Sequence, residues 1–192
     1  MALEAETTEI KKAVLTSMRG YMPDEKKKAW KSVHNFLLLD ALQTELIEKT
    51  GMRIELGEGV PSAPIVVVTQ ERLTNDELNL FQVICDRLDI QQSEIYRTTL
   101  LKATKSAIND SNLLIDALYQ EIKIIDPVIL IFFGRSKLYG LSDFHGIPAL
   151  RTYALADMLG NSEEVINRKN EAWKGLRAIT DQYFATLEGG QE

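Results

Sequence analysis

The chain lacks the residues on which several classes of protein depend. Its 192 residues include one cysteine, Cys85, so a single chain can form neither an internal disulfide nor a metal site made of cysteines alone. The two histidines, His34 and His145, are too isolated to suggest a zinc motif. The longest apolar run, near 128–133, is far too short to cross a bilayer. Acidic residues occupy the start of the chain, where a signal peptide needs a basic and then an apolar run, so the predicted location is the cytoplasm.

Excess positive charge is also absent. The formal net charge is -6 and the pI is about 5.1, which argues against broad, non-specific binding of nucleic acid, because that needs a basic face. A local basic patch remains compatible with this balance. Apolar residues make up 45% of the chain and charged residues 26%, which is typical of a globular protein with a packed core.

The spacing of apolar residues predicts two helices in the first third of the chain. One covers residues 3–19 and ends at Gly20, and the second runs from Asp24 to Thr50, with Gly51 as its C-terminal cap. A basic cluster at the start of the second helix is interpreted as a solvated face. The apolar positions of this helix that we expect to face the core are Trp30, Val33, Leu37, Leu38, Ala41, Leu42, Leu46 and Ile47.

Strands alternate with helices from residue 64 onward, after a linker over 51–63 that includes a short predicted strand at Arg53–Leu56. Strands are predicted over 64–69, 94–101, 128–133 and 147–153, and helices over 75–88 (N-cap Asn75), 112–125 and 163–187. This order predicts an α/β fold: a three-layer α/β/α sandwich with a central, mainly parallel four-stranded sheet, plus an N-terminal helical extension. The predicted units are the extension (1–60), the α/β/α domain (61–188) and a tail (189–192).

The inward-facing side chains of these three helices follow from the same helical spacing. Those expected in the core are Leu78, Phe81, Ile84 and Leu88; Leu114, Leu118, Ile122 and Ile125; and Ile166, Trp173, Leu176, Ile179, Tyr183 and Leu187. Cys85 lies beside the first of these stripes and is interpreted as a small core residue.

Polar and basic residues gather where the predicted strands end, and ligands of doubly wound folds bind beyond these carboxyl ends. Gly134 would let a phosphate approach backbone N–H groups at the start of the next helix. The predicted ligand-binding residues are Thr69, Gln70, Arg72, Thr99, Lys102, Lys105, Gly134, Arg135, Ser136 and Lys137. A nucleotide, a phosphorylated small molecule or a DNA end would fit this cationic cluster. The competing interpretation is that these are scattered, solvated side chains.

Three stretches share a pattern with one family. They are DPVILIFFGRS at 126–136, GIPALRTYALADMLGN at 146–161 and IYRTTLLK at 95–102. Their sequence and order resemble the uracil-DNA glycosylase superfamily, most nearly its iron–sulfur, thermophile-type branch. The resemblance covers roughly residues 62–188 and implies the α/β/α fold of that family.

The residues that would carry the family's chemistry are replaced. The resemblance places Gln70 at the position of the acidic residue that positions the hydrolytic water, and an amide cannot act as a general base. Thr99 stands where the family has the asparagine that reads uracil, and Ala154–Ala156 replaces the loop whose histidine stabilises the leaving base. The four cysteines that bind the family's cluster are absent. We therefore expect a degenerate active site without a cofactor.

Three functions stay open at this point. In the first, base excision is lost and the domain binds nucleic acid or a phosphorylated ligand at the strand ends. In the second, the chain is an active or altered DNA glycosylase or hydrolase of DNA repair, with Glu71, Asp143 and His145 as candidate catalytic residues. In the third, it is a protein-interaction module of replication or repair machinery, contacting a partner or a second copy through its N-terminal helices.

Overall fold

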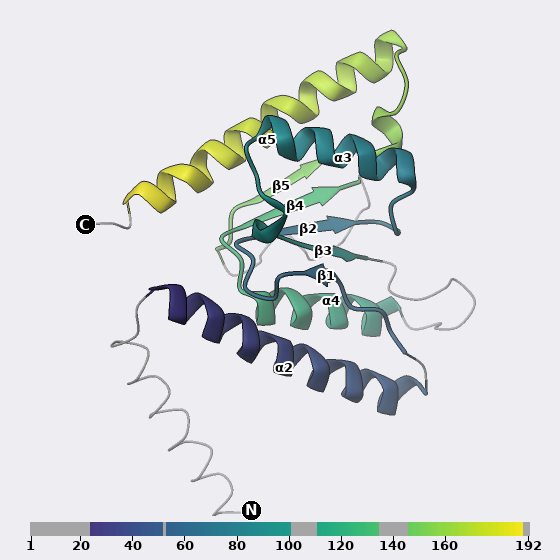
Figure 1. The fold of residues 1–192 in the computed structure, drawn as a ribbon. Coiled ribbons are helices and arrows are strands. Elements are labelled where there is room, and N and C mark those ends of the chain that lie inside the picture. The colour runs from purple at the N-terminus through teal and green to yellow at the C-terminus, as the bar shows by residue number, and fades with distance from the viewer. Residues whose placement is uncertain (1–23, 52, 101–110, 135–145, 190–192) are drawn as a thin grey trace, which may run out of the picture.

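The computed structural model describes residues 24–51, 53–100, 111–134 and 146–189, which form an α/β fold around one mixed sheet (Figure 1). The strand order is β1-β3-β2-β4-β5. β1 is antiparallel to β3, and the other neighbouring pairs are parallel. The bounds of the strands are Glu58–Gly59 (β1), Ile65–Thr69 (β2), Ile95–Thr99 (β3), Ile129–Phe133 (β4) and Ala149–Thr152 (β5).

The edge strand β1 corrects two predictions. The sheet has five strands with an antiparallel edge, where four mainly parallel strands were expected, and the strand predicted at Arg53–Leu56 is wrong. The chain pairs with β3 slightly later, with Gly59 opposite Tyr96. This approach depends on the glycines on either side of Glu58, because a Cβ atom on Gly57 or on Gly59 would lie only 2.4 Å from a carbonyl oxygen of β3.

Helices cover both faces of the sheet. Their bounds are Asp24–Thr50 (α2), Asn75–Arg87 (α3), Ser111–Ile125 (α4) and Glu163–Gly189 (α5). In Figure 1, α3 and α5 lie over one face, whereas α4 covers the other and α2 lies outside α4. The alternation of side chains along β2 divides the core accordingly: Ile65 and Val67 pack on the side of α3 and α5, and Val66 and Val68 on the side of α4.

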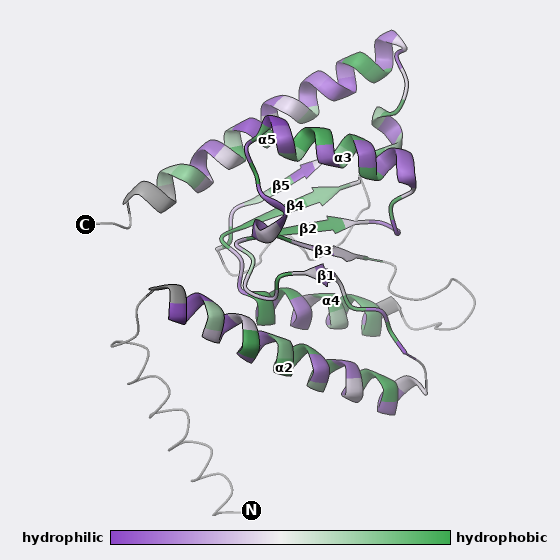
Figure 2. Cartoon of the chain, viewed as in Figure 1, coloured by the Kyte–Doolittle hydropathy of each residue, from purple (hydrophilic) through white to green (hydrophobic). Residues whose placement is uncertain are grey.

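The two central strands confirm the predicted β-branched core. All five residues of β2 and all five of β4 are buried, and both strands are among the most apolar parts of the fold (Figure 2). On α4, all four expected positions are buried. Cys85 is 3% exposed within the cluster on the α3 side, as predicted, and burial raises the pKa of its thiol to about 12. This cysteine is a packing residue without thiolate character.

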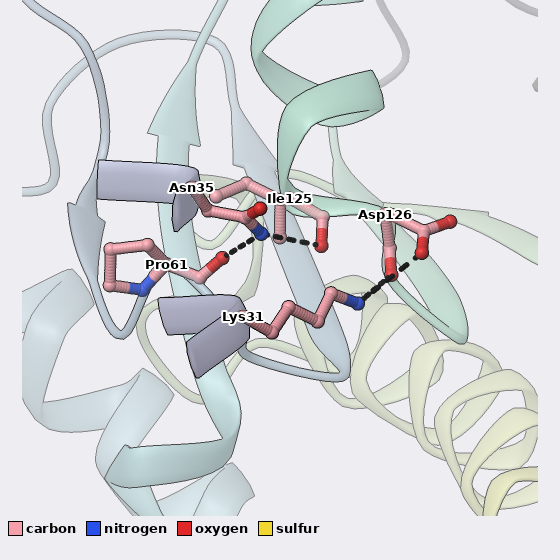
Figure 3. A network of polar contacts seen from close by, with 5 residues as sticks. All are labelled: Lys31, Asn35, Pro61, Ile125 and Asp126. Carbon is pink, nitrogen blue, oxygen red and sulfur yellow. Dashed lines mark hydrogen bonds and ion pairs between the residues drawn. The ribbon is translucent and has the colours of Figure 1, made fainter. Parts of the chain in front are cut away.

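Helix α2 is attached through its buried Asn35 (Figure 3). The side-chain amide of Asn35 donates to the carbonyl of Pro61 at 2.7 Å and to that of Ile125 at 3.4 Å. Nearby, the ammonium group of Lys31 donates to the backbone carbonyl of Asp126 at 2.9 Å and lies 3.3 Å from its carboxylate. These contacts fix α2 to the loop before β2 and to the end of α4.

The outward face of α2 corrects another prediction. Leu42 and Leu46 are buried as expected, and Leu39 joins them. Five side chains expected inside are instead exposed: Val33 (57%), Leu37 (60%), Leu38 (39%), Ala41 and Ile47 (40%). The physical reason is that apolar residues surround most of the circumference of α2, whereas α4 and the sheet cover only one side of it.

Other element boundaries differ only in detail. Helix α3 is capped by Thr74, one residue before the expected Asn75, since Thr74 and Glu77 form a reciprocal capping box. On α5, Leu176, Ile179 and Tyr183 are buried as predicted, but Ile166 is 46% exposed. The predicted helix at 3–19 lies outside the described residues. No helix in the described part of the chain is both long and apolar enough to span a bilayer.

Candidate functional site at the carboxyl edge of the sheet

The four parallel strands end side by side on one edge of the sheet. Thr69 of β2 pairs with Thr99 of β3 and with Phe133 of β4, and Phe133 pairs with Thr152 of β5. The chain leaves β2 toward β3 through α3 on one face, and it returns from β3 to β4 through α4 on the other. The adjacent ends of β2 and β4 therefore form a topological switch point, the position at which ligands of open α/β sheets bind.

Gln70 and Gly134 face each other at this switch point. Gly134 has φ = +129°, a conformation that strongly favours glycine. The nearest non-adjacent atom to a Cβ built on Gly134 would be Oε1 of Gln70, at 4.0 Å. The amide of Gly134 donates to the carbonyl of Thr152 at 3.0 Å, so this N–H is already satisfied within the sheet. A ligand bound at this point would contact the carboxamide of Gln70, because Gly134 has no side chain to obstruct it.

Thr69 shapes the loop that carries Gln70. Its side chain is 4% exposed, and its hydroxyl donates to the carbonyl of Glu71 at 2.8 Å, closing a tight turn directly after β2. Its own carbonyl accepts from the amide of Leu100 at 2.8 Å. Thr69 is thus better described as a support for the site than as a ligand contact.

A pocket of about 290 Å³ lies beside the switch point, at the end of β3. It contains three of the predicted site residues, Thr69, Arg72 and Thr99, and it adds residues that the sequence reasoning missed. The missed polar residues are Glu55, Glu58, Arg97 and Thr98. Glu55 and Glu58 lie in the segment that the sequence pattern predicts as a linker, and Arg97 and Thr98 lie within β3 and not beyond its end.

The arginines of this pocket are paired with carboxylates. Arg72 lies 2.6 Å from Glu55, and Arg97 forms an ion pair with Glu58. The guanidinium of Arg97 also lies 5.7 Å from the ring centre of Phe81, a distance suited to a cation–π contact. The formal charges of the four groups cancel. Any excess of positive charge at this edge must therefore come from other residues.

Beneath the same pocket, Glu121 of α4 is fully buried and holds three donors. One carboxylate oxygen accepts from the amide of Gly57 at 2.5 Å and from the hydroxyl of Tyr96 at 2.7 Å, and the other accepts from Thr98 at 2.8 Å. Burial, and then the nearby carboxylate, raise the pKa of the Tyr96 hydroxyl. A charged residue between Leu118 and Ile122 was the signal in the sequence that could have revealed this network.

The structure describes only some of the remaining predicted site residues. Lys102, Lys105, Arg135, Ser136 and Lys137, together with the catalytic candidates Asp143 and His145, lie outside the described residues. Glu71 is described and exposed. Leu155, in the segment 154–156, is 1% exposed and belongs to the core.

The chain matches no protein-family model and no curated protein. The resemblance to the uracil-DNA glycosylase superfamily therefore rests on the motifs quoted above.

Proposed function

We propose that the chain is a three-layer α/β/α domain of the uracil-DNA glycosylase type that has lost base excision and binds a phosphate-bearing ligand. The ligand is a nucleic acid or a phosphorylated small molecule, and its site is the switch point between β2 and β4. The observation that carries the proposal is the pair Gln70 and Gly134, where a side-chain amide faces an open glycine. The sequence resemblance is what assigns Gln70 to the position of the family's acid. An amide can donate to and accept from a ligand but cannot take its proton.

The charge of the site decides which residues should bind the phosphate. Since Arg72 and Arg97 are paired with Glu55 and Glu58, they contribute little net attraction. The proposal therefore assigns the phosphate contacts to the four basic residues that follow β3 and β4 in the sequence: Lys102, Lys105, Arg135 and Lys137. Each contact with a single-stranded phosphate backbone adds about 0.7 to the slope of log K against log salt.

The test is a titration of a fluorescein-labelled single-stranded oligonucleotide, followed by anisotropy at several salt concentrations. Replacing the four basic residues by alanine should weaken binding by about tenfold or more and make the salt dependence shallower. The matched control replaces four exposed lysines elsewhere, Lys26, Lys28, Lys49 and Lys174, and so removes the same charge. Inorganic triphosphate as a competitor tests whether phosphate alone is recognised.

Three outcomes would contradict the proposal. If both variants bind the oligonucleotide equally weakly, the attraction depends on the overall charge of the chain and not on the four residues after β3 and β4. Release of uracil from a uracil-containing oligonucleotide would instead favour the active glycosylase, with Glu71, Asp143 or His145 as the residues to replace next. Absence of binding to both the oligonucleotide and triphosphate would leave the protein-interaction module as the better hypothesis.

A further inference from the structure

A strip of apolar side chains lies on the outer face of α2. Phe36 is 61% exposed, and Val33 and Leu37 are exposed to a similar extent. One turn earlier, Ala29 is exposed and Trp30 is half-buried. These residues share one face of the helix, because positions three and four apart lie on adjacent turns. We call Ala29, Trp30, Val33, Phe36 and Leu37 the outer strip.

The outer strip lies opposite the side of α2 that is already packed. Leu39, Leu42 and Leu46 are buried toward α4 and the sheet. Among the described elements, α2 is the outermost on its side of the sheet, and none of them covers the outer strip (Figure 1). Contiguous exposed apolar side chains of this kind mark surfaces that bind another protein chain.

The outer strip is arranged symmetrically about Val33. Ala29 and Trp30 lie four and three residues before Val33, and Phe36 and Leu37 lie three and four residues after it. A twofold axis through Val33 would therefore bring the first pair of one chain against the second pair of an antiparallel copy. The small side chain of Ala29 would leave room for Phe36 of the copy, while Trp30 would pack against Leu37 of the copy.

Opposite charges flank the outer strip at equal distances. Lys26 lies seven residues before Val33 and Asp40 lies seven residues after it, which is about two helical turns in each direction. Both side chains are exposed. The same twofold axis would place Lys26 of each chain opposite Asp40 of the other. A surface for an unrelated partner has no reason to mirror itself in this way, whereas a twofold contact requires self-complementarity.

The charge along the whole helix favours the same antiparallel arrangement. Before Val33, α2 carries four lysines and two acidic residues, and after it three acidic residues and one lysine. Lys31 is paired with Asp126 of its own chain, and the basic excess of the first half persists without it. An antiparallel pair sets the basic half of one helix against the acidic half of the other, whereas a parallel pair sets like charges together.

We propose that two copies of this chain associate through the outer strip, with their α2 helices antiparallel and Val33 on the twofold axis. The contact from Lys26 to Asp40 extends about 21 Å along each helix. An interface of this size is small, so the dimer forms and dissociates at micromolar concentrations. The proposal is independent of the ligand site, which lies at the carboxyl edge of the sheet.

The test is sedimentation velocity of the full chain between about 1 µM and about 100 µM, the range in which small interfaces dissociate. The wild-type chain should pass from monomer to dimer over this range. Val33→Asp places two like charges on the twofold axis and should weaken dimerisation by about tenfold or more. Because Val33 is 57% exposed, circular dichroism of this variant should show an unchanged fold.

Charge reversal tests the register. Lys26→Asp and Asp40→Lys should each weaken the dimer by about tenfold, because each sets like charges opposite one another. The double variant should restore the wild-type dissociation constant to within about threefold. The matched control makes the same two substitutions at exposed positions of α5, Lys174→Asp and Asp181→Lys. Helix α5 covers the other face of the sheet, so these variants should dimerise like the wild type.

Three results would overturn the proposal. A wild-type chain that stays monomeric over the whole range would leave the outer strip to a different occupant. A dimer that Val33→Asp leaves intact would place the interface elsewhere on the molecule. If the double variant dimerises no better than the single variants, Lys26 does not face Asp40 and the antiparallel register about Val33 is wrong.

Discussion

The hydroxyl of Tyr96 donates a 2.7 Å hydrogen bond to the carboxylate of Glu121, entirely inside the interface between α4 and the sheet. Glu121→Ala removes the acceptor of three donors at once, so we expect a loss of about 3 kcal/mol in the free energy of unfolding. Tyr96→Phe should cost about 1–2 kcal/mol. The measurement is urea unfolding of both single variants and the double variant. Their effects should be non-additive by about 0.5 kcal/mol or more, and simple additivity would show that the bond contributes nothing.

Gly57 tests how closely the edge segment must approach β3. In Gly57→Ala, the new methyl group would lie 2.4 Å from a backbone oxygen of β3, which cannot move without breaking the sheet. We expect a loss of about 1–3 kcal/mol in unfolding free energy. Gly175→Ala on α5 is the matched control, since its nearest atom, at 2.8 Å, is the end of the flexible Leu150 side chain. If both variants unfold at the same urea concentration, the close approach at Gly57 is unimportant.

Two substitutions at the start of α3 distinguish the observed N-cap, Thr74, from the predicted N-cap, Asn75. Thr74→Ala should lower the unfolding free energy by about 1 kcal/mol, because its side chain caps the amide of Glu77. Asn75→Ala, at the position predicted from the sequence, should change it by less than about 0.5 kcal/mol. Thermal unfolding followed by circular dichroism measures both. The reverse order of effects would restore Asn75 as the cap.

Alkaline pH should destabilise the chain through Cys85. Its thiol has an ordinary pKa of 9.0 and a folded-state pKa of about 12, so above pH 9.0 the unfolded chain gives up a proton that the folded chain keeps. Stability is therefore complete below pH 9.0 and falls as the pH rises toward 12. Between about pH 8 and about pH 9.5 we expect a loss of roughly 1 kcal/mol from this group. Urea unfolding of Cys85→Ala should show a smaller pH dependence over this range, and an unchanged dependence would contradict the assignment.

Sequence patterns located the sheet better than the site. Continuous β-branched runs identified β2 and β4, because strands buried on both faces need no polar alternation. The same reasoning failed for α2, since apolar spacing alone does not say which of two apolar faces meets the core. Gln70 and Gly134 could be expected near each other from the parallel order of the strands. The ion pairs of Arg72 and Arg97 could not, because their partners, Glu55 and Glu58, come from a segment whose pairing with β3 the sequence pattern does not predict.

The hydrogen bonds that the Asn35 amide donates to the carbonyls of Pro61 and Ile125 have a consequence for how the chain unfolds. The amide of Asn35 bridges the loop before β2 and the last turn of α4. Leu39, Leu42 and Leu46 of the same helix pack into the core on the α4 side of the sheet. Release of α2 would uncover apolar surface and two backbone carbonyls together. Helix α2 should therefore unfold in the same cooperative step as α4 and the sheet. A fragment beginning near residue 61 should consequently aggregate when expressed without it.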